Sequence, residues 1–196
     1  VPRLLTSKGL LSQEHALALG LSGPLLRSCG VPQDGRQGDV TLGYDELDFP
    51  VVVGERGDNL DRCLLRAEEI ATSLSIIGQA LSALPPGPVV VDDPRVAIRP
   101  SHPPACHPLH LIHRMKAIIE DLTPPPGESY VPVESPHGEL GFLLICDGTT
   151  QPRRVRCRSP HFANLQALPG MLLGGLMEDV QRTFTLLGYG SSEGER

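Results

Sequence analysis

The turn between Glu134 and Glu139 brings together the residue types that transfer protons. Two carboxylates, Glu134 and Glu139, lie on either side of the imidazole of His137. Such groups act as general acids and bases, and their coupling pushes their pKa values apart. We favour a structural interpretation over acid–base chemistry, because charges beside an apolar strand need partners and a basic strand follows in the sequence. Its arginines are Arg154, Arg156 and Arg158.

A second cluster contains residue types that bind metals. Its members are His102, Cys106, His107, His110 and His113. Zinc accepts imidazole and thiolate ligands. However, the spacing fits no common zinc pattern, and the first residues lie in a proline-rich loop. Ordinary hydrogen-bonded histidines are the competing interpretation, and we predict no metal site.

A third candidate is the glycine-containing loop GERGDNLDR, which begins at Gly54 and leads into a helix. The N-terminus of a helix can hold an anion. Here Asp58 and Asp61 already occupy that positive end, and the Lys-Ser/Thr pair of a phosphate-binding loop is missing. The sequence therefore does not predict a nucleotide site.

Composition narrows the class of protein. The chain has 196 residues, a net charge of −6 and 5 cysteines. The negative charge argues against a nucleic-acid partner. The cysteines form no C-x-x-C pair, so they predict neither a disulfide framework nor an iron–sulfur cradle. No apolar run approaches the ~20 residues that span a bilayer, and the sequence starts at Val1 without a secretory signal. We expect a chain that is soluble or peripheral to a membrane, or a processed or partial product.

Helices are expected to position most of these residues. The clearest helix runs from the N-cap residue Asp58 to Leu84. Its apolar residues form two adjacent rows, which predict a core helix of a bundle. A second core helix is expected from Pro108 to about Leu122. The first 57 residues should be irregular, with short helices at Ser12–Leu19 and after Pro24, and a short strand near 40–43.

An antiparallel meander should follow over residues 128–158. Its strands are predicted at Tyr130–Glu134, Leu140–Cys146 and Arg153–Arg158. The middle strand is apolar on both faces, so both faces should be covered. A C-terminal helix is expected within 160–187, broken near Pro169-Gly170. The predicted fold class is α+β, a helical bundle core with a small antiparallel sheet.

Several blocks of the sequence resemble one family. They are GPLLRSCGV from Gly23, GDNLDRCLLRAEE from Gly57 and ESPHGELG from Glu134. In order and over nearly the whole chain, they resemble the C-terminal half of the 49-kDa or D subunit of respiratory complex I, NADH:quinone oxidoreductase. That subunit belongs to the nickel–iron hydrogenase large-subunit superfamily. The resemblance implies that 1–196 is half of a larger, hydrogenase-like fold.

The resemblance also implies a function. The subunit would help to form a quinone-reduction chamber beside the terminal iron–sulfur cluster of a neighbouring subunit, where electron transfer from NADH is coupled to proton translocation. Residues near that chamber would be Glu134, His137, Glu139, Glu193 and Arg196. A structural charge network would contain Arg154, Arg156, Arg158, Asp61, Arg62, Arg66 and Glu69. The chain alone would bind no cofactor and hold no complete active site, and ubiquinone would be shared with other chains.

The sequence departs from the family pattern in three ways. His137 stands where the family has Lys or Arg, which replaces a fixed charge by a titratable one. The last residues match the family only at Glu193 and Arg196. The family subunit is about twice as long, so we expect either a truncated chain or a split subunit. In a split subunit the N-terminal half would be a separate chain, joined through a large apolar interface. Iron–sulfur and membrane-arm subunits would be further partners.

Location and one alternative function stay open. The runs GERGDNLDR and PPGPVVVDD resemble mitochondrial more than bacterial relatives, which favours the matrix side of the inner membrane over the cytoplasmic face of a bacterial membrane. The alternative function is a scaffold or zinc-binding relative of the subunit. Expression of the chain alone would separate the two functions. A complex subunit should be unstable or insoluble by itself, whereas the alternative predicts a soluble, zinc-containing monomer.

Overall fold

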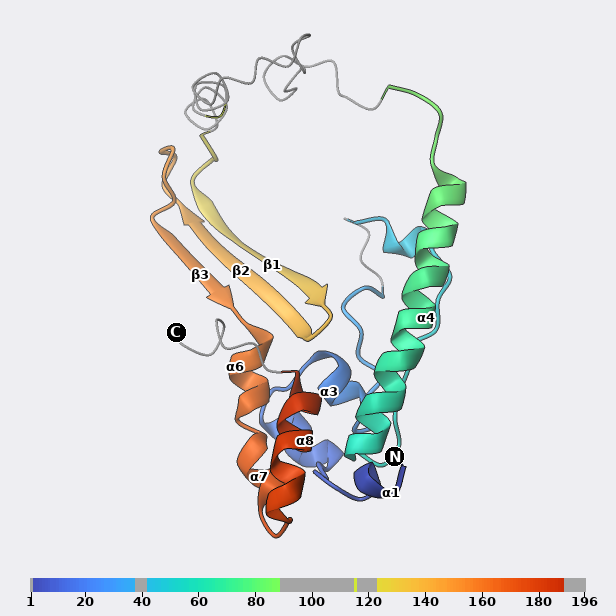
Figure 1. Ribbon diagram of the computed structural model, residues 1–196. Helices are drawn as coiled ribbons and strands as arrows, with labels where there is room; N and C mark the ends of the chain where they lie inside the picture. Colours follow the sequence, from blue (N-terminus) through green and yellow to red (C-terminus); the bar gives the residue numbers. More distant parts are fainter. Residues whose placement is uncertain (1, 38–41, 89–114, 116–122, 189–196) are drawn as a thin grey trace, which may run out of the picture. The chain divides into compact units, whose positions relative to one another are not determined.

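The computed structural model describes residues 2–37, 42–88, 115 and 123–188 (Figure 1). The chain divides into two compact units. The first contains Val1–Ala83, Val131–Phe142 and Cys157–Arg196, and the second contains Leu84–Tyr130 and Leu143–Arg156. Helices and a three-stranded antiparallel sheet make up the described residues, which confirms the predicted α+β class. No described helix is long and apolar enough to pass through a membrane.

Short helices fill the first part of unit 1. They are α1 (Pro2–Leu5), α2 (Gln13–Ala18), α3 (Gly23–Arg27) and the 3-10 helix η1 (Tyr44–Glu46). Ser12 caps α2 as predicted, because its Oγ accepts a hydrogen bond of 3.2 Å from the His15 amide. The strand expected near 40–43 is wrong in its described part. Leu42 and Gly43 form a turn, and Gly43 has the positive φ of +74° that a strand does not use.

The long helix α4 spans Asn59–Ala83, within one residue of its predicted bounds. Asp58 is its N-cap, since Oδ1 accepts a hydrogen bond of 2.9 Å from the Asp61 amide. The beginning of α4 contacts α1, α3 and the C-terminal helix α8 (Met177–Leu187). Farther along, Gln79 exchanges two hydrogen bonds with the backbone of Asp48. The helix is therefore fastened to the rest of unit 1 at several points.

The core of unit 1 does not include the apolar stripe of α4. The buried apolar cluster consists of Leu11, Ala16, Leu21, Leu25, Leu26, Cys29, Ala167, Met171 and Leu187. Within α4 the only buried apolar side chain is Leu65, and the other buried residues are Asn59, Asp61, Arg62 and Thr72. The predicted core position of the stripe is therefore wrong for this chain by itself. Helical periodicity identified an apolar face, but it could not show what covers that face.

The sheet has the strand order β1-β2-β3. Its strands are β1 (Gly127–Ser135), β2 (Gly138–Cys146) and β3 (Arg154–Arg158), so all three predicted strands are present. The expectation that both faces of β2 are fully covered is wrong, because Phe142 and Leu144 are 39% and 36% exposed. Both strands of the β1–β2 hairpin are longer than predicted, which leaves a two-residue connection.

Three helices stand where one interrupted helix was predicted. They are α6 (Pro160–Leu165), α7 (Leu168–Leu172) and α8. Pro169 lies in the first turn of α7, where its missing N–H costs no hydrogen bond. The helix breaks therefore lie before and after α7, whereas Pro169-Gly170, the predicted break, lies within it. Gly188 ends α8 with a φ of +77°. The predicted helix Pro108–Leu122 lies outside the described residues, apart from Met115.

Candidate functional site

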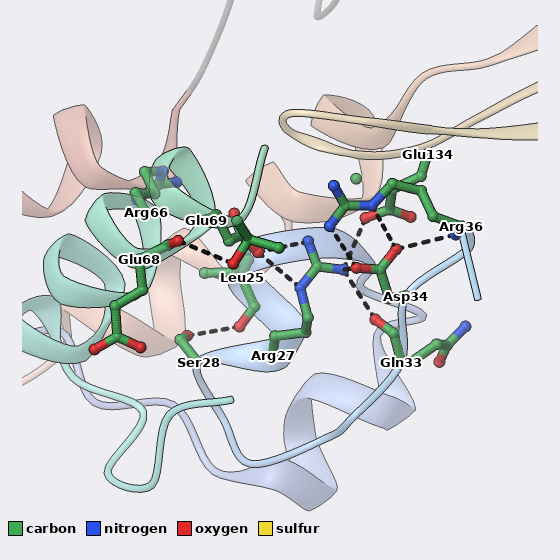
Figure 2. A network of polar contacts seen from close by, with 12 residues as sticks. Leu25, Arg27, Ser28, Gln33, Asp34, Arg36, Arg66, Glu68, Glu69 and Glu134 are labelled. Atoms are coloured by element: carbon green, nitrogen blue, oxygen red, sulfur yellow. Dashed lines mark hydrogen bonds and ion pairs between the residues drawn. The ribbon is translucent and has the colours of Figure 1, made fainter. Parts of the chain in front are cut away.

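Arg27 is the centre of a buried charge cluster in unit 1 (Figure 2). Its side chain is only 2% exposed, at the end of α3. Nε donates to Oε1 of Glu69 at 2.9 Å, and Nη1 donates to Oε1 of Glu134 at 2.8 Å. Nη1 also donates to the Gln33 carbonyl oxygen at 2.9 Å. A single guanidinium thus connects α3, the loop that follows it, α4 and β1.

A second arginine completes what we call the Arg27 cluster: Arg27, Asp34, Arg36, Glu69 and Glu134. Arg36 donates to both carboxylate oxygens of Asp34, at 2.9 and 2.6 Å. Burial alone would raise the pKa of Asp34, but the hydrogen bonds from Arg36 outweigh it and lower that pKa. With every group ionised, the cluster holds two positive and three negative charges. It is therefore a densely paired network with one excess negative charge.

A pocket of about 480 Å³ lies beside this cluster. Arg27, Arg36, Glu69 and Glu134 form its polar side, together with Arg66 from α4. The remaining lining is mostly apolar, with Tyr44, Ile70, Leu74 and Pro136 joined by Ser73, Ser135 and His137. The pocket therefore combines charged and apolar surfaces within one unit of the chain.

The β1–β2 turn holds Glu134, His137 and Glu139 against α3. The Ser22 Oγ accepts a hydrogen bond of 3.0 Å from the Glu139 amide. Gly23 and Gly138 approach so closely that a Cβ on Gly23 would lie 2.3 Å from the Gly138 Cα. Both glycines also have a positive φ, of +66° and +136°. The ESPHGE sequence thus needs its glycine in order to pack on the start of α3.

The two predicted carboxylates have different partners. Glu139 forms an ion pair of 2.6 Å with Arg158 of β3, as the structural interpretation expected. Glu134 instead pairs with Arg27, which is 107 residues away in the sequence, so its predicted pairing with the β3 arginines is wrong. Arg154 and Arg156 are exposed and form no ion pair with the described residues. A local pattern could not reveal the long-range partner.

His137 is near a second imidazole that the sequence did not single out. The rings of His137 and His161 have centroids 4.6 Å apart. Asn164 donates a hydrogen bond of 3.0 Å to the His137 carbonyl oxygen, and a ring nitrogen of His161 bonds the Gly188 carbonyl oxygen. The turn is thereby joined to α6 and to the end of α8. His161 gave no signal in the sequence, because no other imidazole or carboxylate lies near it in the chain.

The predicted charge network at the start of α4 is only partly formed. Asp61 pairs with Arg56 at 2.7 Å, and its Oδ2 accepts the amides of Glu55 and Arg56. Arg62 is fully buried but bonds only neutral groups, the Asn59 side chain and the Gly57 carbonyl. Burial lowers the pKa of Arg62 to about 10. Since aspartates occupy the helix end, this loop offers no open anion site.

Side chains that can bind metals are present in the part of the chain that the structure describes, but they are not grouped into a site. There, no group of three His, Cys, Asp or Glu side chains is placed to hold a metal ion. Cys29, Cys63, Cys146 and Cys157 are free thiols, and burial raises the pKa of Cys29. The cluster from His102 to His113 lies outside the described residues, as do Glu193 and Arg196.

Comparison with known proteins decides the family. The family model described as "Respiratory-chain NADH dehydrogenase, 49 Kd subunit" matches residues 4–196. The chain belongs to this 49-kDa subunit family. Arg27, Glu69 and Glu134 lie in blocks on which the sequence resemblance was based, so the family motifs supply three of the five residues of the Arg27 cluster; Asp34 and Arg36 lie outside these blocks.

Curated members of the 49-kDa subunit family show how much of a relative the chain covers. It is 42% identical over 177 residues to the D subunit of the NADH-quinone oxidoreductase of Ehrlichia ruminantium (strain Gardel), covering 88% of the chain and 44% of the relative. For the D subunit of Anaplasma marginale (strain St. Maries), the identity is 44%, over 88% of the chain and 43% of the relative. The D subunit of Geotalea uraniireducens (strain Rf4) is 42% identical over 172 residues. The chain thus spans less than half of these relatives.

Proposed function

We propose that this chain acts as part of the D subunit in the peripheral arm of an NADH:quinone oxidoreductase, where it helps to form the quinone-reduction chamber. The observation that carries the proposal is the family match over residues 4–196. The chain would supply no complete active site of its own. Electrons from NADH would arrive through the terminal iron–sulfur cluster of a neighbouring subunit.

The reaction needs protons as well as electrons, because a quinone takes up two electrons and two protons to become a quinol. Glu134, His137 and Glu139 are titratable groups on one turn, and the first and last pair with arginines. We assign them to the coupling of quinone chemistry to proton movement. A change of charge at the quinone would shift the balance among these ion pairs, and a shift in paired charges is one way to transmit such a change. Glu193 and Arg196 belong to the same proposed vicinity by family resemblance.

The partners follow from the same assignment. The remainder of the subunit, as a separate chain or as the rest of a longer one, would complete a hydrogenase-like bundle. Iron–sulfur and membrane-arm subunits would surround it, and ubiquinone would be the shared substrate. The location would be the matrix side of the mitochondrial inner membrane or the cytoplasmic face of a bacterial membrane. The relatives named above come from bacteria, whereas two sequence runs favour mitochondria.

Replacement of Glu139 by Gln tests the coupling role. Glu139→Gln keeps the size of the side chain but removes its charge and its ion pair with the half-exposed Arg158. In the assembled complex we expect NADH:quinone activity to fall on the order of tenfold, since a positioned acid–base group contributes at least that much. NADH oxidation by an artificial acceptor that bypasses quinone should not change.

Glu128→Gln is the matched control, because Glu128 is an exposed carboxylate on the same sheet. It should leave both activities at the wild-type level. If Glu139→Gln leaves both assembly and quinone activity unchanged, the proposed role of this turn is wrong. Loss of the complex itself would instead show that Glu139 is needed for assembly.

A further inference from the structure

The helix α4 packs one side against its own unit and leaves its apolar side largely exposed. Leu65, Glu69 and Thr72 lie on the inner side, where Glu69 bonds Arg27 and Thr72 is buried. On the outer side, Ile70, Leu74, Ile77 and Leu81 are 64%, 65%, 54% and 63% exposed. We call these four residues and Arg66 the α4 face. A helix normally buries its apolar side, so this arrangement requires a cover.

The α4 face is continuous along the helix. At 100° per residue, its five members fall within one narrow strip on the helix surface. Small residues, Ala67, Ala71 and Gly78, border the strip, and no atom lies within 4 Å of a Cβ that would be added to Gly78. Small side chains allow close approach of a second helix. The shape of the face therefore suits another helix that packs along α4.

Arg66 adds an electrostatic requirement at one end of the α4 face. Its side chain is half-buried, and burial lowers its pKa, an effect that Glu69 only partly opposes. Its one hydrogen bond is a long one of 3.4 Å to the Arg62 carbonyl oxygen. The Glu69 carboxylate forms an ion pair with Arg27. Figure 2 shows the Arg66 side chain apart from Arg27. Among the described residues, no carboxylate forms an ion pair with Arg66.

Four other arginines of unit 1 have the carboxylate partner that Arg66 lacks among the described residues, whereas the buried Arg62 is held by two neutral acceptors. Arg27, Arg36, Arg56 and Arg158 each have a carboxylate oxygen within 2.6 to 2.8 Å. A half-buried guanidinium without such a partner is costly, and a carboxylate is the ligand that its planar fork fits best. The pocket in front of Arg66, next to Ile70, Leu74 and Pro136, has room for one.

We propose that the α4 face docks an amphipathic helix from the rest of the D subunit, and that this helix carries a carboxylate that pairs with Arg66. The inference rests on the proposed function. Relatives are more than twice as long as the stretch matched here, so a large part of the subunit is available as the occupant. A second copy of this chain is the competing occupant, and a cross-link to a second copy would reveal it.

Variants of Arg66 test the ion pair in the tagged full chain, expressed with the complex. Arg66→Gln should reduce the amount of intact complex recovered through the tag on the order of tenfold, because the docked carboxylate would be left without its cation. Arg66→Lys keeps the charge and should restore most of the recovery. Arg154→Gln is the control, because Arg154 is an exposed arginine that forms no ion pair with the described residues.

Cross-linking identifies the carboxylate directly. A water-soluble carbodiimide joins an ammonium to a touching carboxylate as an amide, with loss of water. In the Arg66→Lys complex we expect one new cross-link from position 66 to an Asp or Glu of the rest of the subunit, found by mass spectrometry. A cross-link within this chain, for example to residues 89–122, or to a second copy, would overturn the proposal.

The two proposals fail in different ways. If the Arg66→Gln chain is recovered in wild-type amount as part of an active oxidoreductase, the ion pair is refuted but the proposed function still stands. Failure of the wild-type chain to join an NADH:quinone oxidoreductase would refute the proposed function. In that case a position-66 cross-link to an unrelated protein would also refute the occupant named here.

Discussion

At the scale of single residues, buried ion pairs between distant segments hold the site together, whereas the sequence suggested pairs between nearby segments. Arg27 is almost completely buried and binds two carboxylates from α4 and β1. Breaking such a pair from one side costs about 3–5 kcal/mol, because the remaining charge stays buried. Glu134, which first suggested acid–base chemistry, is thus also part of the structural framework. Its role in catalysis and its role in stability cannot be separated by one substitution, which is why the more exposed Glu139 is the better test.

Asp34 gives a pH-dependent prediction at this scale. Its pKa in the folded chain lies below the ordinary value, chiefly because the Arg36 hydrogen bonds outweigh burial. The pair therefore contributes stability above about pH 4, and that contribution is lost as the pH falls through the lower pKa of the folded state. Asp34→Asn should cost about 1–2 kcal/mol at neutral pH. The stability difference from wild type should shrink below about pH 4.

The measurement is the thermal midpoint of the purified assembly as a function of pH, compared between Asp34→Asn and wild type. The difference between the two curves is used because other groups titrate equally in both proteins. A difference that stays constant, or grows, as the pH falls below 4 would contradict the role assigned to the Asp34–Arg36 pair.

At the scale of elements, capping residues and apolar periodicity predicted where the helices lie in the sequence but not what packs against them. Asp58, Ser12 and helical periodicity placed α4 and α2 to within one or two residues, because capping and periodicity are local properties. The same signals could not show which side of α4 is covered, since the cover must come from elsewhere. Nor could they pair Glu134 with Arg27, because that contact joins segments 107 residues apart.

Two helix caps provide the prediction at this scale. The fully buried Asp58 accepts the Asp61 amide at the start of α4 and also the Ser7 amide at 2.8 Å. Ser12 accepts one amide at the start of the exposed helix α2. Asp58→Ala leaves two amides without acceptors and should destabilise the chain by about 2–4 kcal/mol. Ser12→Ala should cost about 0.5–1 kcal/mol.

Thermal unfolding of the assembly that contains each variant compares the two caps. The order of the effects is the test, because Asp58 accepts two amides from different segments whereas Ser12 accepts only one. Equal losses for Asp58→Ala and Ser12→Ala would show that the connection from Asp58 to the N-terminal segment contributes nothing.

At the scale of the whole molecule, the described residues leave apolar surface exposed that the proposed assembly would cover. The α4 face, together with Phe142 and Leu144 of β2, leaves large apolar side chains uncovered. The proposed assembly would account for this exposure, since the chain spans only 43–44% of the relatives named above. The sequence predicted the family and the α+β class, but the partners of a surface are a property of the assembly.

Isolation of the native complex tests the central claim most directly. The chain should be tagged at one end in its own cells, purified under mild conditions, and the co-purifying polypeptides identified by mass spectrometry. The proposed function predicts the rest of the D subunit and iron–sulfur subunits in defined ratio, together with NADH:quinone activity. A stable, inactive monomer that recovers none of these polypeptides would contradict it.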